Sequence, residues 1–226
     1  MKLREKIYIC SALGLSLQTA GANIIDDTYG IGAGSFELGP FANGGGTPAY
    51  TGSDFMALPS GSTVISGWTV GGVDGVDWII TPSYAAGHGV HSIDLQNQPL
   101  TLGTITTVIP TISGGVYRLT FDAAAVAIFG NAIGQVSAGS LVNQSYTTSY
   151  SGATATQVFA PFSFQFTAIG SSTAITFKSN VPAASLYGPV IDAVSVTAVP
   201  ELPTMWLFGL GATGMAGLLR RRRVQQ

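Results

Sequence analysis

Apolar and polar side chains alternate along several short stretches of this chain. The pattern is clearest at 116–122, and it recurs at 162–167 and 175–178. A period of two residues with one apolar face is typical of half-buried antiparallel strands. Further strands are predicted at 64–70, 75–81, 91–96, 100–109 and 189–198.

No window of 11 residues or more has a convincing helical period. Eight or more short strands, joined by Gly-rich turns, predict an all-β fold, which would be an antiparallel β-sandwich or jelly roll. The stretch 128–158 is rich in Ser, Thr, Gly and Ala and alternates only weakly. It forms either edge strands or a mobile loop.

An apolar run near the C-terminus extends from Met205 to Leu219. Four consecutive arginines follow it: Arg220, Arg221, Arg222 and Arg223. A helix of this length spans roughly 22 Å, which is short of a hydrocarbon core of about 30 Å. Because clustered cations stay on the cytoplasmic side, we expect a single membrane helix with the rest of the chain outside. The alternative, an amphipathic terminal helix, would need a polar face that this run lacks.

An acidic hexapeptide precedes the apolar run: Val199, Pro200, Glu201, Leu202, Pro203 and Thr204. The motif, the short apolar helix and the arginine cluster resemble, in this order, the PEP-CTERM sorting signal of Gram-negative bacteria. The sequence differs from the simplest pattern by Leu202, which separates Glu201 from Pro203. The resemblance implies that residues 199–226 are recognised and cut by the membrane protease exosortase.

Residues 1–22 have the features of a signal peptide. A basic region precedes an apolar run at 7–17, and the small residues at 20–22 fit a cleavage site. Cys10, the one cysteine, is removed with the peptide, so we expect a mature chain without disulfides, thiolate metal sites or a cysteine nucleophile. We expect export through the inner membrane, anchoring by the C-terminal helix, and then display on the cell surface or secretion.

Residues 23–198 remain as one domain, and this domain is acidic. Only Arg118 and Lys178 are basic, against nine Asp and Glu residues, which gives a formal charge of −7. A surface of this sign repels phosphate backbones, so we expect no nucleic-acid partner. The length suits a single domain with a substantial core.

Six landmarks follow one another along the domain: GSFELGPF, PSGSTVISGWTV, VDWI, HSIDL, VYRLTFD and GPVIDAVSV. In this order they resemble the choice-of-anchor C family, and the likeness spans nearly all of 33–198. It implies a jelly roll of the galactose-binding type, as in carbohydrate-binding modules, and a relationship to plant cell-wall domains of unknown function. Members of that family carry different C-terminal anchors, of which the PEP-CTERM tail is one.

Two carboxylates, Glu37 and Asp192, are the candidates for a metal site. Glu37 lies in the predicted opening strand and Asp192 in the closing strand, and such strands often run side by side in a jelly roll. Carboxylate and carbonyl oxygens are the ligands that Ca²⁺ prefers. The resemblance to sandwich binding modules implies a structural calcium ion held by these two residues. The alternative is that each carboxylate accepts hydrogen bonds from turn amides and holds no ion.

Aromatic side chains are the candidates for stacking on a sugar. Trp68 shares parity with Val64 and Val70, so it is predicted to fill the core. Trp78 follows Asp77 in a stretch where parity is less decisive. The ligand-binding candidates are Tyr84, Trp78, Tyr146 and Tyr150.

Other side chains give little support for a metal centre or for catalysis. His88, His91 and Asp94 are spaced by three residues, but a strand would place His91 and Asp94 on opposite faces. There is no G-x-S-x-G motif, and Asp74 and Asp77 are interpreted as solvated acids of a turn. We therefore expect no transition-metal site and no enzyme.

The predicted function is that of an exported bacterial surface protein whose β-sandwich binds exopolysaccharide or envelope glycans. One alternative is a structural or adhesion protein of the extracellular matrix that contacts other proteins. A weaker alternative is a hydrolase with an unrecognised site.

Overall fold

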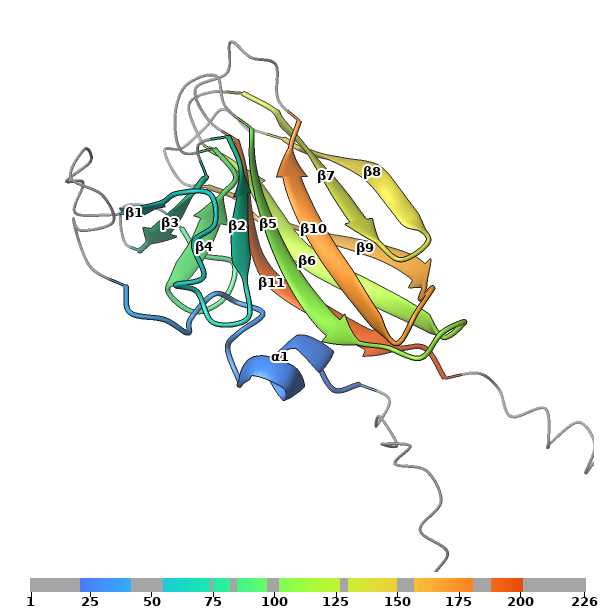
Figure 1. Ribbon diagram of the computed structural model, residues 1–226. Coiled ribbons are helices and arrows are strands. Elements are labelled where there is room, and N and C mark those ends of the chain that lie inside the picture. Colours follow the sequence, from blue (N-terminus) through green and yellow to red (C-terminus); the bar gives the residue numbers. More distant parts are fainter. Residues whose placement is uncertain are drawn as a thin grey trace, which may run out of the picture.

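Two antiparallel β-sheets pack face to face in the computed structural model of this chain (Figure 1). The structure describes residues 21–41, 55–73, 75–81, 85–96, 102–126, 130–149, 157–180 and 188–200. The signal peptide up to residue 20 and the sorting tail from Glu201 onward lie outside the described residues, as do Arg220 to Arg223. Within the described residues, no helix is long and apolar enough to cross a membrane. The all-β prediction is confirmed.

The larger sheet, called sheet A, has the strand order β1-β3-β4-β11-β6-β9. Its strands are β1 (Phe55–Leu58), β3 (Val76–Ile80), β4 (His91–Asp94), β6 (Val116–Ala125), β9 (Ala160–Thr167) and β11 (Pro189–Ala198). The last strand of the domain, β11, therefore lies between β4 and β6, which come from distant parts of the sequence. These pairings join the last strand of the domain to strands from its middle.

The smaller sheet, called sheet B, has the strand order β2-β5-β10-β7-β8. Its strands are β2 (Thr69–Gly72), β5 (Gly103–Pro110), β7 (Ala132–Ala138), β8 (Leu141–Thr148) and β10 (Ser172–Ser179). The weakly alternating stretch 128–158 thus contributes β7 and β8, with β8 at the edge of the sheet. Of the two readings of this stretch, the edge strand is the one that the described residues support.

Both sheets direct alternate side chains into one apolar core. In β6, Tyr117, Leu119 and Phe121 are all at most 2% exposed, as their shared parity predicted. Trp68 is also buried, although it lies before β2 and not within a strand. Among the described residues, the members of the main cluster fall between Ile24 and Val196.

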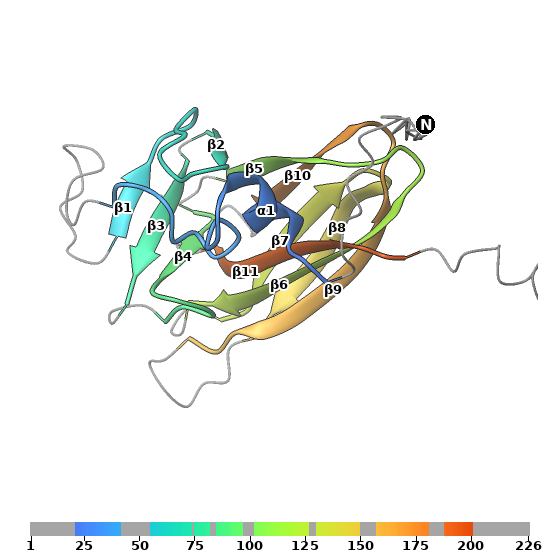
Figure 2. The same cartoon turned by 90° about the horizontal axis from the view of Figure 1, so that it is seen from below.

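A six-residue helix, α1 (Ile24–Tyr29), closes one end of the sandwich, where the sequence predicted no helix. Asn23 caps it, because its side-chain oxygen accepts a hydrogen bond from the N–H of Ile25 at 3.2 Å. The amide group of Asn23 also donates to the carbonyl of Val194 in β11, at 3.1 Å. The helix contacts β5 of sheet B and β11 of sheet A, and it lies across the gap between them (Figure 2). It has too few turns to produce a recognisable helical period.

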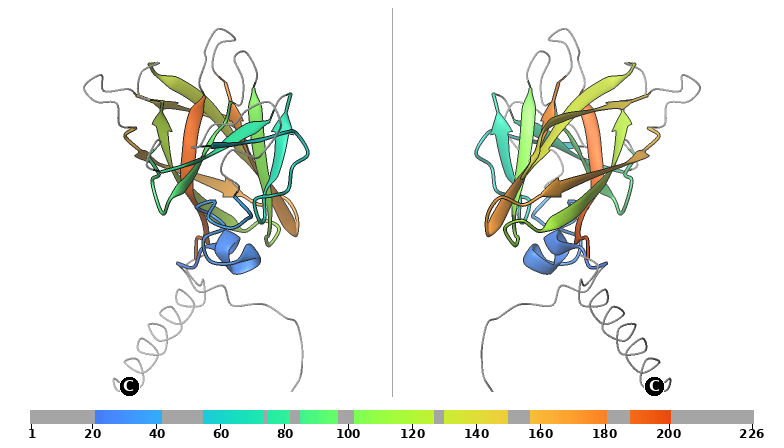
Figure 3. Two further views of the ribbon diagram at one scale, coloured as in Figure 1. Left: turned by 90° about the vertical axis from the view of Figure 1, so that its left-hand side faces the viewer. Right: turned by 90° about the vertical axis from the view of Figure 1, so that its right-hand side faces the viewer.

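The sandwich has two different ends (Figure 3). At the helix end lie α1 and the last residues of β11, so both ends of the described chain leave from there. At the opposite end, called the loop end, β4, β6, β8 and β10 finish and β5, β7, β9 and β11 begin. The short connection from β2 to β3 lies there too, so the ends of five connections between strands converge at the loop end, away from both termini of the domain.

Candidate functional site

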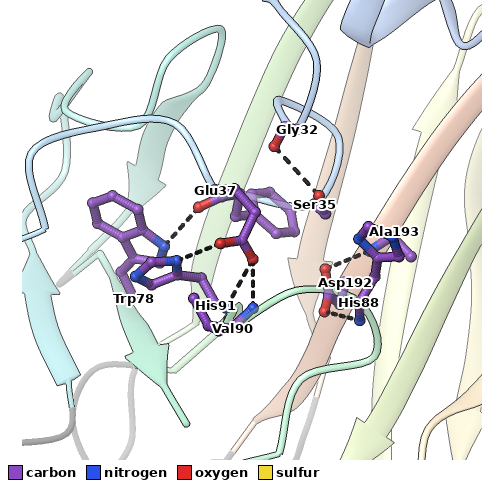
Figure 4. A network of polar contacts seen from close by, with 10 residues as sticks. Gly32, Ser35, Glu37, Trp78, His88, Val90, His91, Asp192 and Ala193 are labelled. Atoms are coloured by element: carbon purple, nitrogen blue, oxygen red, sulfur yellow. Dashed lines mark hydrogen bonds and ion pairs between the residues drawn. The ribbon is translucent and has the colours of Figure 1, made fainter.

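Glu37 holds one turn of the chain, residues 87–91, against the sandwich (Figure 4). Its Oε1 accepts hydrogen bonds from the N–H groups of Val90 (2.8 Å) and His91 (2.9 Å). Its Oε2 lies 2.9 Å from Nδ1 of His91. Both carboxylate oxygens are therefore used within the protein, because charge-assisted hydrogen bonds to backbone amides stabilise a carboxylate strongly.

Asp192 holds the same turn from the other side. Its Oδ2 accepts a hydrogen bond from the N–H of His88 at 2.8 Å, and its Oδ1 accepts one from the N–H of Ala193. Burial raises the pKa of Asp192 to about 7; the amides of His88, Ala193 and Gly87 lower it, and the nearby charge of Glu37 raises it slightly. Two carboxylates from opposite ends of the domain thus meet at one turn, as the sequence predicted.

Each of these carboxylates has a neighbour with a left-handed backbone. Phe36, directly before Glu37, has φ 59°, and Ala193, directly after Asp192, has φ 51°. Neither residue is glycine, so the backbone is strained at both positions. Phe36 is fully buried against Trp68, and Ala193 lies at an irregularity in the β11–β6 pairing between Asp192 and Ser195. Packing on one side and the strand bulge on the other hold the strained residues in place.

The position of Glu37 differs from the prediction in one respect. Residues 31–36 form turns and not an opening strand, and they run beside β11 because Gly34 accepts a hydrogen bond from the N–H of Val194 at 2.8 Å. A Cβ atom on Gly34 would collide with the carbonyl of Val194. The close approach of two backbones at this glycine brings Glu37 to the turn at 87–91.

The donors around Glu37 and Asp192 are N–H groups, whereas Ca²⁺ needs oxygen ligands. Among the described residues, no group of three or more His, Cys, Asp or Glu side chains could hold a metal ion. The hydrogen bonds are those expected from the alternative to calcium. An ion would have to displace several amides, and calcium binding itself stays a prediction.

His91 lies in the core and not in a solvent-exposed loop. Its ring packs against Trp78 and Phe41, with centroid distances of 5.0 Å and 4.8 Å. Asp94 points to the opposite face of β4, where burial is the main reason that its pKa lies well above the usual range. His91 and Asp94 therefore point to opposite faces of β4, as their spacing in a strand predicted.

A second group of acids lies on the outer face of sheet A. Asp77 in β3 is directly opposite Asp94 in β4, and both side chains point away from the core that Trp78 and Ile93 fill. Asp94 accepts hydrogen bonds from the N–H groups of Gln96 (3.1 Å) and Gly188 (3.2 Å). Burial raises the pKa of Asp77 to about 7, and Oδ1 of Asp77 is shielded from solvent without a hydrogen-bond partner in the described residues.

Asp77 is therefore not a solvated acid of a turn, and that interpretation was wrong. The sequence contained the signal for a strand here, because Asp77 stands between two apolar residues, Val76 and Trp78. In a strand these two side chains point to one face and Asp77 points to the other. The cross-strand partner Asp94 could not be found in this way, since the register of β3 and β4 is a property of the fold. Asp74 lies outside the described residues.

Gln157 belongs to the same outer layer. Its Oε1 accepts a hydrogen bond from the N–H of Ala85 at 2.9 Å, and the carbonyl of Ala85 accepts one from the hydroxyl of Ser92. Ser92 is on the same face of β4 as Asp94, two residues away. Gln157 is only 7% exposed, and its Nε2 has no acceptor within the described part of the chain.

Two of the four aromatic ligand-binding candidates are buried, and this corrects their assignment. Trp78 is 0% exposed and donates from Nε1 to the carbonyl of Phe36 at 3.1 Å. Tyr146 is 3% exposed and packs edge-on against Phe121. A buried ring cannot form a platform for a sugar. Tyr84 and Tyr150 lie outside the described residues, so they stay predictions.

Three comparisons place this chain among known proteins. The model of a family described as "Protein of unknown function (DUF642)" matches residues 32–197. No curated protein matches the sequence. The solved structures include carbohydrate-binding modules that are similar to this chain.

One of these is TmCBM61 in complex with β-1,4-galactotriose, with 18% identity over 58% of this chain and 88% of that chain and a TM-score of 0.44. Another is the CBM22-1 xylan-binding domain from Paenibacillus barcinonensis Xyn10C, with 16% identity over 64% and 92% of the two chains and a TM-score of 0.44. A cyclase from Fischerella sp. TAU is also similar, with 16% identity over 72% and 97% and a TM-score of 0.45. At these values, the likeness does not identify a ligand or a reaction for this chain.

Proposed function

This chain belongs to the DUF642 family, and from that premise we propose that its sandwich is a glycan-binding domain without catalytic activity. The ligand class is a neutral, hydroxyl-rich polysaccharide of the cell envelope or the extracellular matrix. Membership in the choice-of-anchor C group, export, and processing of the tail by exosortase at the membrane belong to the same proposal. They rest on the sequence landmarks and on the order of motifs in residues 199–226.

The observation that carries the proposal is the unpaired acceptor on the outer face of sheet A. Oδ1 of Asp77 and Nε2 of Gln157 are both shielded from solvent and have no partner among the described residues. A buried polar atom without a partner costs about 1–3 kcal/mol. A sugar hydroxyl donates and accepts hydrogen bonds at once, so a polyol suits a layer that contains both an unpaired acceptor and an unpaired donor.

The arrangement of the two ends supports display on a surface. The described chain ends at the helix end, after β11, and residues 201–226 come next in the sequence. Asp77 lies near the beginning of β3 and Asp94 at the end of β4, which is the side of sheet A toward the loop end. A tether through the tail would leave this region facing away from the membrane.

A glycan array with residues 23–198 tests the proposal. We expect binding of neutral polysaccharides, and we expect Asp77→Asn to weaken it at least about tenfold, which corresponds to 1.4 kcal/mol. The matched control is Asp27→Asn, the same change at an exposed position in α1, and it should leave binding unchanged. If the domain binds no polysaccharide but sediments with biofilm protein, the alternative of a structural matrix protein is favoured. New reducing ends in the bound polymer, lost in Asp77→Asn, would instead indicate a hydrolase.

Two further measurements test the finer parts of the proposal. The mass of the mature protein shows whether the tail has been cut, and an intact cluster from Arg220 to Arg223 would indicate a plain membrane anchor. Calorimetric titration with Ca²⁺ after EDTA treatment tests the ion that the family resemblance implies for Glu37 and Asp192. Heat and a rise in Tm would support the ion, and the absence of both would leave the amide-bonded carboxylates as the complete site.

A further inference from the structure

Strand β8 forms one edge of sheet B, and its sequence lacks the features that usually protect such an edge. Exposed edges present unpaired N–H and C=O groups, and natural proteins shield them with lysine, proline or very short strands. Strand β8 has eight residues and contains neither charge nor proline. Asn143, Gln144, Ser145 and Thr147 are all exposed on it.

The other edges in the described part of the chain are protected. Strands β1 and β2, at the opposite side of the sandwich, have four residues each, and β2 ends in Gly71 and Gly72. Strand β9 at the edge of sheet A contains Pro161, which cannot donate to a neighbouring strand. Of the four edge strands described, β8 alone is long, uncharged and free of proline.

Charge distinguishes this part of the molecule from the remainder. Between Asp122 and Lys178 the sequence has no charged residue, and this interval contains β7, β8 and β9, which we call the neutral wing. The domain as a whole is strongly acidic, so two copies repel each other at most contacts. At the neutral wing this repulsion is weakest, and a second copy can approach there.

Only part of β8 is available for pairing. Its pairing with β7 is irregular between Val136 and Ala138, and Asn143 on the β8 side has φ 49°, so the first residues of β8 are twisted by a bulge. The turn before the strand is fixed to β9, because the N–H of Ser140 donates to the carbonyl of Thr167 at 3.0 Å. The regular part is residues 144–148, in which Tyr146 is anchored in the core.

We propose that two copies of this chain pair through residues 144–148 of β8, antiparallel and related by a two-fold axis. The two B sheets then form one continuous sheet, and the same residues face each other across the axis, as in any isologous contact. The shared surface is small, so the dimer forms with a clear dependence on concentration. The outer acids lie on sheet A and β8 lies on sheet B, so this contact does not involve them, which would give a bivalent glycan binder if the proposed function holds.

Cysteine cross-linking tests the geometry directly, since residues 23–198 contain no cysteine. Single Gln144→Cys, Ser145→Cys and Thr147→Cys variants cover the segment around the axis. We expect at least one of them to form a disulfide-linked dimer under mild oxidation, because paired strands bring equivalent Cα atoms within the range of a disulfide. Ala174→Cys, exposed on the outer face of the central strand β10, is the matched control and should stay monomeric.

Sedimentation equilibrium of residues 23–198 provides the second test. We expect a monomer–dimer equilibrium, and we expect the double variant Ser145→Lys with Thr147→Lys to weaken it at least about tenfold, because like charges directly opposite each other destabilise strand pairs. Ala174→Lys adds the same type of charge away from the edge and should have little effect. A wild-type domain that is monomeric at every concentration, or a dimer unaffected by the two lysines, would overturn the proposal. Because self-association is measured without glycan, its failure leaves the glycan proposal untouched.

Discussion

Glu37, Asp77, Asp94 and Asp192 lie on or against β3, β4 and β11, whereas the neutral wing has no charged residue. On the acidic side, carboxylates hold turns in place through backbone N–H groups. Next to the neutral wing the contacts are aromatic. Phe121 of β6, the strand that pairs with β9, contacts the rings of Tyr146, Phe162, Phe164 and Phe177. The contacts on the acidic side therefore involve groups that can ionise, whereas the aromatic contacts do not.

The largest effect is expected in the aromatic cluster around Phe121, beside the neutral wing. Phe121→Ala removes a 1% exposed ring from the centre of the aromatic cluster and should lower the free energy of unfolding by about 3–5 kcal/mol. Phe121→Leu refills much of the space and should cost clearly less. Urea unfolding of both variants measures this difference. Equal losses for Ala and Leu would mean that the ring contacts themselves, and not the filled volume, stabilise this aromatic cluster.

Glu37→Ala tests the acidic side with a smaller expected effect. It leaves the N–H groups of Val90 and His91 without their acceptor, so we expect a loss of about 2–3 kcal/mol. Glu37→Gln keeps one acceptor oxygen and should lose about half as much. Hydrogen exchange at the amides of Val90 and His91 is the specific readout, and it should become faster while exchange in β7 and β8 stays unchanged. Faster exchange throughout the domain would contradict a local role.

The pH dependence of stability is expected to come from the acidic side, because the neutral wing has no charged residue. The native state retains a proton on Asp77 up to a pKa of about 7, whereas the unfolded chain releases it near 3.8. The native state therefore binds more protons between these values, and stability falls as the pH rises from about 4 to about 7 and then levels off. Asp77→Asn should weaken this dependence and raise Tm at pH 8 by about 2–4 °C for each kcal/mol of burial penalty removed. Thermal scans from pH 4 to pH 8 measure it, and a steeper dependence in the variant would contradict it.

Ser145→Lys should have the smallest effect on folding. The side chain is exposed on β8, so the free energy of unfolding should change by less than about 0.5 kcal/mol. Tyr146→Ala, one residue further along, removes a buried ring and should cost several times more. Chemical unfolding at a low protein concentration, where the monomer predominates, compares the two. A large loss in Ser145→Lys would show that the edge of the wing contributes to the monomer and does not serve association alone.

Alternation was sufficient to predict most strands of the core. Strands β6 and β9 have regular apolar faces, and both were predicted close to their observed positions. Strands β1, β7 and β8 were not predicted as definite strands, because their apolar residues do not alternate with polar ones over a long enough stretch. Tyr146 illustrates the difficulty, since it is buried opposite Gly134, which provides the space for its ring. That partner can be identified only when the register of β7 and β8 is known.

Part of the candidate site could also be predicted from the sequence, and part could not. The meeting of Glu37 and Asp192 was expected because the first and last strands of a jelly roll often run side by side, and the structure brings both carboxylates to the turn at 87–91. The donors that meet them there were not predictable, because they are backbone amides and every residue except proline has one. The position of Asp77 opposite Asp94 could not be predicted either, because cross-strand neighbours depend on the register of the two strands.

The sequence by itself determined that the domain is an all-β sandwich, that it is acidic, and that the apolar face of β6 belongs to its core, because these properties follow from composition and from a period of two residues. Trp68 is buried as predicted, but it lies outside a strand, so the period of two does not explain its burial. Only the tertiary structure decided which polar groups meet. It buried Trp78 and Tyr146, placed Asp77 opposite Asp94, and put the uncharged strand β8 at the edge of sheet B. The physical reason is that burial and strand pairing are set by contacts between residues far apart in the chain, which a local pattern does not specify.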